Sequence, residues 1–194
     1  HATRWDLPAG GQRMFVSLLM ALRGSACIYQ GEELGLPEAD VAFEDLQDPY
    51  GIQFWPEFKG RDGCRTPMVW DRDNHHGGFS AVRSWLPVPS EHLGLSVAAQ
   101  EDEPGALLHH YRRAIAFRHS HPALSVGSHD KMQAQGDVIY FTRTARDQTI
   151  LCAFNVSETP SDFNPPAGDW VPIGAELGSA HISADGKLHF GPWQ

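Results

Sequence analysis

The chain has 194 residues, with 15 Lys and Arg against 24 Asp and Glu, a formal net charge of −9, and 41% hydrophobic residues. This length and composition are typical of one globular domain or two small ones and exclude a disordered or fibrous protein. The negative charge removes the electrostatic attraction on which nucleic-acid and anionic-membrane binding depend. No apolar run approaches the roughly 20 residues of a membrane span, so we expect neither nucleic acid nor membrane as a partner.

The chain contains three cysteines, Cys27, Cys64 and Cys152, which are far apart and form no C-x-x-C motif. An odd number at this spacing favours free thiols in a reducing compartment, so we expect a cytoplasmic protein. The chain starts at His1 with no basic and apolar leader. This start indicates that a preceding portion has been removed or that the chain was made as a piece.

The first elements read as the end of an α/β unit. Pro8 fits a first helical turn, and apolar residues recur at helical spacing from Met14 to Leu22, which predicts a helix over residues 8–23 that Gly24 ends. The short apolar run at residues 26–30 predicts a strand buried on both faces, as in parallel sheets. The order helix, tight turn, buried strand is typical of α/β folds.

A long irregular segment follows, from residue 31 to about residue 103. It carries many prolines and little periodicity, and residues 31–58 hold eight carboxylates and no Lys or Arg. So long a loop in a compact domain is unusual unless it is functional.

The rest of the chain is predicted as one helix and a β-rich region. Pro104 and the apolar stripe after it predict a helix over 104–120 that ends before Pro122. From residue 126 to the end, short β-type runs at 138–143 and 149–155, with shorter ones near 170–173 and 188–190, predict a small antiparallel β domain.

Common catalytic and cofactor motifs are absent: there is no G-x-S-x-G, P-loop, G-x-G-x-x-G or H-E-x-x-H. Adjacent histidines such as His109 and His110 point in different directions on a helix, so we expect no metal site and no cofactor. The long loop instead combines carboxylates, Arg61, Arg65 and tryptophans, a mixture that suits sugars. On residue types alone, core tryptophans with surface ion pairs are the favoured explanation of this mixture.

Two strings carry a family resemblance. Residues 28–36 (IYQGEELGL) and 60–68 (GRDGCRTPM), followed by Trp70-Asp71, resemble the bacterial α-glucosidases of glycoside hydrolase family 13, the α-amylase family. The resemblance is strong from residue 8 to about 126 and fades in the β-rich tail. Val69 departs from the family's usual Gln or Pro, which could tune specificity.

The resemblance implies a fold and a set of site residues. Residues 1–125 would be the C-terminal end of a (β/α)₈ TIM barrel, contributing its last strand, two helices and a long loop, and residues 126–194 a small antiparallel β-sandwich domain. Arg61 would pair with a carboxylate at the closed end of the glucose pocket and touch the non-reducing sugar. Arg65 and Glu33 would hold the loop or line the next subsite. The substrate would be an oligosaccharide or glucoside.

The resemblance also indicates what is missing. Retaining glycosidases need two carboxyl groups about 5 Å apart, and in this family they come from earlier barrel strands, with a further Asp in an Asn-His-Asp motif that this sequence lacks. We therefore expect a C-terminal fragment without catalytic residues, whose partner is the missing N-terminal barrel portion. An orphan eighth strand would otherwise favour self-association.

Two other interpretations concern the β-rich tail. It could be a non-catalytic carbohydrate-binding module with Trp170 or Trp193 as stacking platforms, or it could serve a purely structural role.

Overall fold

The computed structural model describes residues 7–178 and 180–194, which form two compact units. The loop unit comprises Ile28–His109 together with Leu7, and the helix–sheet unit comprises Pro8–Cys27 and His110–Gln194. The expected division at residue 125 concerns an intact barrel and stays a prediction. The expectation tied to His1 lies outside the described residues.

Among the described residues, the helix–sheet unit contains wholly or mainly the α-helices α1 (Ala9–Ala21), α5 (Leu107–Ser120) and α6 (Pro122–Ser125) and the short 3-10 helix η5 (Ala175–Leu177). The predicted helix at 8–23 matches α1. Helix α5 begins three residues after the predicted start, because Pro104, Gly105 and Ala106 form a turn in which Ala106 N donates to Glu103 O. In the described parts of the chain, no helix has the length and hydropathy to cross a membrane.

The helix–sheet unit contains two antiparallel sheets. In the first, β3 (Val138–Ala145) pairs with β4 (Gln148–Asn155) on one side and with β1 (Ser128–His129) and β2 (Gln133–Gln135) on the other. In the second, β7 (Leu188–Phe190) lies between β5 (Ser161–Phe163) and β6 (His181–Ile182). The predicted runs at 138–143 and 149–155 form the antiparallel pair β3 and β4, and the run at 188–190 forms β7, whereas the predicted strand near 170–173 is not formed.

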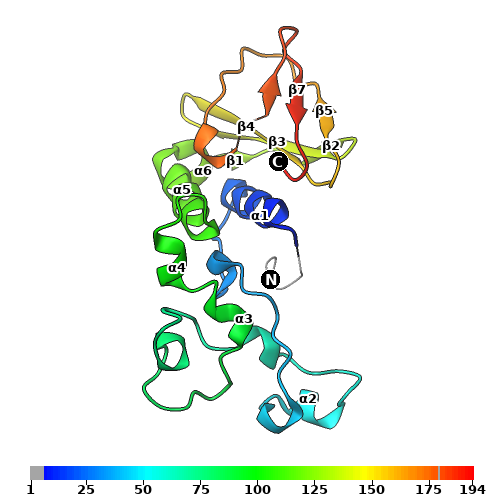
Figure 1. The fold of residues 1–194 in the computed structure, drawn as a ribbon. Coiled ribbons are helices and arrows are strands. Elements are labelled where there is room, and N and C mark those ends of the chain that lie inside the picture. The colour runs from blue at the N-terminus through cyan, green and yellow to red at the C-terminus, as the bar shows by residue number, and fades with distance from the viewer. Residues whose placement is uncertain (1–6, 179) are drawn as a thin grey trace. The chain divides into compact units, whose positions relative to one another are not determined.

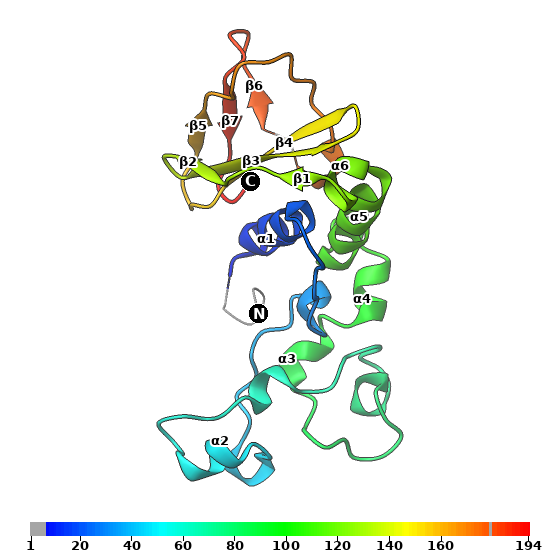
Figure 2. The same ribbon diagram turned by 180° about the vertical axis from the view of Figure 1, so that it is seen from behind.

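The apolar residues of β3 and β4 alternate between two apolar interiors, as the period of a strand requires. One interior contains Phe141, Ile150, Cys152 and Phe154 together with Met14, Ala21, Ala123 and Leu124 from the helices. The other contains Val138, Tyr140, Leu151 and Ala153 together with Phe163, Leu188 and Phe190 from the second sheet. The first sheet is therefore covered on one face by helices and on the other by strands (Figures 1 and 2).

The C-terminal end of α1 is held by two buried guanidinium groups. Arg118 donates to the carbonyl oxygens of Met20, Leu22 and Gly24. Arg143, fully buried on β3, donates to the carbonyl oxygen of Ala21 and to those of three residues between 124 and 128. These cations satisfy helix-terminal carbonyls that lack a partner within α1 and complement the helix dipole.

The predicted strand at residues 26–30 is the main correction to the sequence-based fold. These residues form no regular element and are exposed or half-buried. A strand exists only through hydrogen bonds to a neighbour, and the described chain offers no strand between residues 7 and 127 with which this segment could pair. An apolar run alone is therefore not enough to predict a strand at residues 26–30.

The loop unit consists of short helical turns joined by irregular chain, so the expected long irregular segment is present. The helical turns are η1 (Glu32–Leu34), η2 (Phe43–Asp45), α2 (Pro49–Gln53), η3 (Asp62–Cys64), η4 (His75–Gly78), α3 (Ser90–Leu93) and α4 (Val97–Glu101). One apolar cluster contains Leu34, Leu36, Met68 and Leu108, and another Ala39, Val41, Leu46 and Leu86. The buried Gln100 side chain bonds both Leu34 O and Leu108 N, which ties the two ends of the unit together.

Candidate functional site

A cavity of about 560 Å³ lies within the loop unit. Its polar lining consists of Gln30, Gln47, Asp48, Arg61, Asp62, Arg65 and Thr66, and its apolar lining of Pro49, Pro67, Phe79, Trp85 and Leu86. Arg61 and Arg65, two of the three residues expected to bind substrate, therefore share one cavity. A volume of this size accommodates a small organic molecule.

Asp48 is the buried centre of this cavity wall. Asp48 is only 2% exposed, and its carboxylate accepts hydrogen bonds from Tyr50 N (3.1 Å), Arg61 N (3.0 Å) and Arg61 Nε (2.9 Å). Asp48 is the N-cap of α2, and Pro49 occupies the first helical position, a combination that fixes where this short helix begins. The local sequence thus places a carboxylate beneath Arg61.

Asp62 makes the reciprocal connection. Its buried carboxylate accepts from the backbone N–H groups of Gln47 (2.6 Å) and Asp48 (2.7 Å). Asp48 thus holds the segment around Arg61, and Asp62 holds the segment around Asp48. Hydrogen bonds to a charged acceptor are stronger than neutral ones, so this double clamp positions both arginines on a rigid base.

Two glycines permit the close approach of these segments. Gly60 has a φ of +76°, a conformation that a side chain disfavours, and a Cβ there would lie 3.0 Å from Cβ of Asp48. A Cβ on Gly63 would lie 2.3 Å from the carbonyl oxygen of Ala39, whose N–H donates to Gly63 O. The loop carrying Arg61 and Arg65 is therefore packed backbone against backbone.

The electrostatics of the site follow from the Asp48–Arg61 pair. The hydrogen bond from the Arg61 side chain lowers the pKa of Asp48, and the same bond raises the pKa of Arg61. The Arg61 side chain is still 58% exposed, and no acceptor in the described chain contacts its two terminal amino groups within hydrogen-bond distance. Nη1 of Arg65 lies 3.9 Å from the same Asp48 oxygen. The cavity wall therefore contains two guanidinium groups, one of them bonded to Asp48 through Nε alone.

Two exposed aromatic side chains complete the cavity. Phe79 is 50% exposed and Trp85 is 78% exposed. Aromatic faces stack on the apolar faces of sugar rings, and guanidinium donors bond their hydroxyl groups. The combination is suited to a neutral, polyhydroxylated ligand.

Glu33, the third expected residue, lies elsewhere in the loop unit. It is half-buried on η1, and its Oε2 accepts from Gly31 N at 2.9 Å. Gly31 has a φ of +88° at the start of this turn. Glu33 does not line the cavity that contains Arg61 and Arg65, and in this geometry it stabilises the turn that follows residue 30.

Comparison with known proteins assigns the chain to a family. The family model for the alpha amylase catalytic domain matches residues 6–127, well over half of the chain. The chain belongs to the alpha-amylase family. The match covers the whole loop unit, so the cavity with Arg61 and Arg65 is part of an alpha-amylase family domain.

Individual relatives in the alpha-amylase family agree with this assignment. A probable alpha-glucosidase of Rhizobium meliloti (strain 1021) is 50% identical over 178 residues, covering 89% of this chain and 32% of that protein. An oligo-1,6-glucosidase of Heyndrickxia coagulans is 31% identical over 177 residues, covering 81% of this chain and 32% of that protein. The crystal structure of the alpha-glucosyl transfer enzyme XgtA matches with a TM-score of 0.89 and 44% identity, covering 98% of this chain and 36% of that one. The chain thus spans about a third of the length of these alpha-amylase family proteins.

Sequence reasoning missed four residues that shape this alpha-amylase family site: Asp48, Asp62, Phe79 and Trp85. A signal existed for Asp48, because Asp before Pro is typical of a helix N-cap and an N-cap is held in place. No local pattern indicates that Trp85, 20 residues beyond Arg65, reaches the same cavity.

The two tryptophans considered as sugar platforms in the tail are engaged within the protein. The indole N–H of Trp170 donates to Pro166 O at 2.8 Å. Trp193 packs against the interior formed by α1, α6 and the first sheet.

Proposed function

We propose that this chain is the C-terminal part of a retaining α-glucosidase, which hydrolyses terminal α-linked glucose from oligosaccharides or glucosides. The observation that carries the proposal is the half-exposed Arg61 side chain, which is bonded through Nε to the buried Asp48 carboxylate and lines the same cavity as Phe79 and Trp85. The names of the alpha-glucosidase and oligo-1,6-glucosidase relatives support the same substrate class.

Each site residue has a distinct role in this proposal. Arg61 donates hydrogen bonds to the hydroxyl groups of the non-reducing glucose, and Arg65 adds a second guanidinium to the same wall. Asp48 and Asp62 are positioning residues that hold the arginines. Glu33 maintains the loop after residue 30 through its bond to Gly31 N, and so shapes the next subsite.

The catalytic carboxylates belong, in this proposal, to the N-terminal barrel portion. A retaining mechanism needs a nucleophile and an acid/base carboxyl group about 5 Å apart, on either side of the scissile bond. The described carboxylates of this cavity, Asp48 and Asp62, are instead occupied with backbone N–H groups and with Arg61. The 194 residues would then supply a wall of the glucose pocket and no reacting group.

The test uses the intact enzyme with an aryl α-glucoside. Arg61→Ala should lower kcat/KM by about 10- to 100-fold, the equivalent of one or two charged hydrogen bonds. Arg61→Lys should restore little of this loss, because an ammonium lacks the planar fork. Arg83→Ala is the matched control, since Arg83 pairs with Asp45 at the surface and does not line the cavity.

Two results would contradict the proposal. Equal kcat/KM for Arg61→Ala and Arg83→Ala would remove Arg61 from the substrate site. Turnover of the aryl α-glucoside by the purified 194-residue chain would show that the reacting groups lie within it.

For the β-rich region we propose a structural role. Trp170 and Trp193 are engaged in internal contacts, and Arg143 of β3 binds the end of α1. A cytoplasmic location is proposed as well, supported by the free thiols of Cys27, Cys64 and Cys152.

A further inference from the structure

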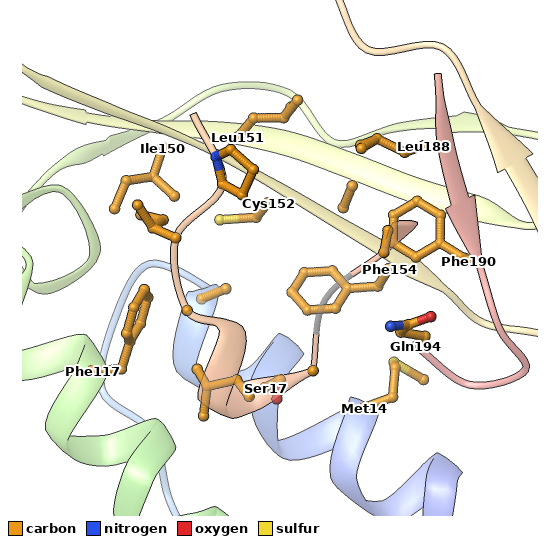
Figure 3. Close-up of a pocket in the computed structure, with 18 of the residues that line it drawn as sticks. Met14, Ser17, Phe117, Ile150, Leu151, Cys152, Phe154, Leu188, Phe190 and Gln194 are labelled. Carbon is orange, nitrogen blue, oxygen red and sulfur yellow. The ribbon is translucent and has the colours of Figure 1, made fainter. Parts of the chain in front are cut away.

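Two aromatic rings at the surface of the loop unit lie outside the site described so far. In the helix–sheet unit, Phe117, Phe154 and Phe190 line a cavity of about 1040 Å³ (Figure 3). Tyr50 of α2 and Phe54, the C-cap of that helix, are instead 58% and 48% exposed. Neighbouring apolar groups at a surface mark a binding site more often than a lone exposed residue does. The roles proposed above use neither ring.

Tyr50 and Phe54 form a parallel pair. Their ring planes differ by 4°, and their centroids lie 6.3 Å apart. Parallel rings at such a separation prefer an offset arrangement, in which each ring leaves part of its face uncovered by the other. The half-exposed side chains agree with this geometry. The pair therefore offers two successive aromatic faces one helical turn apart.

The backbone that carries the pair is fixed. Asp48 caps α2 by accepting a hydrogen bond from Tyr50 N, and Phe54 N donates to Tyr50 O at 3.0 Å. Gly51, between the two aromatic residues, is buried, and a Cβ there would lie 2.6 Å from the carbonyl oxygen of Lys59. Helix α2 is thus packed directly on the backbone of the next loop segment. A ligand that contacts the rings has little backbone freedom to remove.

The pair begins at the wall of the cavity that contains Arg61. Pro49, the residue before Tyr50, lines this cavity. The pKa of Arg61 is raised chiefly by its hydrogen bond to Asp48, and the phenol of Tyr50 contributes to the same shift. Such a contribution requires the phenol to lie near the guanidinium group, because Coulomb interactions decline with distance. Phe54 lies one helical turn farther from the end of α2 that Asp48 caps, so Tyr50 comes first and Phe54 second along a path from Arg61.

We propose that Tyr50 and Phe54 form a platform for the sugar rings that follow the terminal glucose of an oligosaccharide, which rests on the function proposed above. With the terminal glucose against Arg61, the second ring stacks on Tyr50 and the third on Phe54. Aromatic faces suit the apolar faces of sugar rings, and two of them in succession suit a chain of rings. The platform therefore favours trisaccharides and longer chains over disaccharides.

Substitutions in the intact enzyme test the order of the rings. Phe54→Ala should raise KM for maltotriose and maltotetraose by about three- to tenfold and leave KM for maltose unchanged, because maltose ends before Phe54. Its kcat should stay the same, since a contact remote from the scissile bond is made equally in the ground state and the transition state. Tyr50→Ala should raise KM for maltose as well. The isomaltose series gives the same comparison for α-1,6 linkages.

Two further variants separate stacking from folding. Phe54→Tyr keeps the ring and should keep the wild-type KM for every substrate. Val82→Ala, at a 72% exposed apolar position of the loop unit, is the matched control and should also leave each KM unchanged. An equal rise of KM for maltose and maltotetraose in Phe54→Ala would overturn the platform. The same conclusion would follow if Phe54→Ala lowered the thermal midpoint and the activity on all substrates together.

Equilibrium binding separates the platform from the proposed reaction. An intact enzyme that hydrolyses no α-glucoside would refute the proposed function. Calorimetric titration of that enzyme with maltotetraose and isomaltotetraose then decides on the platform. Binding that is about three- to tenfold weaker in Phe54→Ala than in the wild type supports the platform, whereas equal affinities, or no binding to the wild type, overturn it.

Discussion

Arg143 of β3 donates a 2.5 Å hydrogen bond to the carbonyl oxygen of Ala21, the last residue of α1, 122 positions earlier in the chain. The same guanidinium donates to Leu124 O (2.9 Å), Gly127 O (3.2 Å) and Ser128 O (2.9 Å). Burial lowers the pKa of Arg143, and the nearby charge of Arg118 lowers it further. A single side chain thus joins a helix terminus, the end of α6 and the first sheet.

Arg143→Met should destabilise the protein strongly. Methionine preserves the aliphatic stem but leaves four carbonyl oxygens without their donor, a loss of about 2–4 kcal/mol in the free energy of unfolding. Urea unfolding of the full chain measures it. Arg146→Met in the exposed turn after β3 is the control and should change stability by less than about 0.5 kcal/mol. Equal effects from the two substitutions would mean that the buried hydrogen bonds contribute nothing.

Gly63→Ala should displace the loop that carries Arg61 and Arg65. The added Cβ would meet Ala39 O at 2.3 Å, and relieving such a contact costs about 1–3 kcal/mol. The intact enzyme should lose both thermal stability and kcat/KM for an aryl α-glucoside. Gly94→Ala, also in the loop unit, introduces a Cβ with no neighbour within 4 Å at a φ of −68° and should be neutral. A neutral Gly63→Ala would contradict the backbone-to-backbone packing.

Asp48 should make the loop unit sensitive to acid. Its pKa is lowered in the folded state from the ordinary 3.8, chiefly by the bond from Arg61. A depressed carboxyl pKa contributes stability that is complete well above pH 3.8, declines as the pH falls below that value, and vanishes below the folded pKa. Asp48→Asn should lower the free energy of unfolding at pH 7. It should also weaken the dependence of the thermal unfolding midpoint on pH between pH 5 and about pH 2.5. Asp73→Asn, at a highly exposed position, should preserve the wild-type pH profile.

Cys152 should resist alkylation in the folded protein. Burial raises the pKa of its thiol to about 12, so the thiolate fraction at pH 8 is on the order of 10⁻⁴. Iodoacetamide at pH 8 should therefore modify the exposed Cys27 and spare Cys152 until urea unfolds the chain. Peptide mass mapping gives the site of modification. Similar rates at Cys27 and Cys152 in the absence of urea would show that the β4 interior is open.

Secondary structure could be predicted from the sequence where a periodic pattern is long and the segments that pair are close together in the chain. Residues 8–23 show a helical stripe that matches α1, and the runs at 138–143 and 149–155 match a hairpin closed by the tight turn at Arg146 and Asp147. Residues 26–30 show an equally apolar run but form no strand, because pairing depends on a neighbour that composition cannot supply. The short strands β5 and β6 carry too few residues for a period to appear.

The site was predictable in part, for a related reason. The strings containing Arg61 and Arg65 indicated the family, and the structure brings both residues to one cavity. The assignment of Arg61, Arg65 and Glu33 to substrate remains a prediction. Asp62 and Trp85 reach the cavity through the path of the loop, which short helical turns and backbone contacts determine. Such contacts join residues far apart in sequence and leave no periodic trace.

The two apolar interiors on either side of β3 change the meaning of a register error. In a sheet with one wet face, a slip by one residue moves apolar side chains into water and is opposed by the hydrophobic effect. Here a slip would exchange one apolar interior for the other at residues 138–141, but it would also move Thr142 and Thr144, whose hydroxyl groups bond Asp130 and Thr149 at exposed positions. Arg143 would move to the face that carries these two threonines, and the four carbonyl oxygens that it binds would lose their donor. The hydrogen bonds of one buried side chain therefore oppose a change in the alignment of β3.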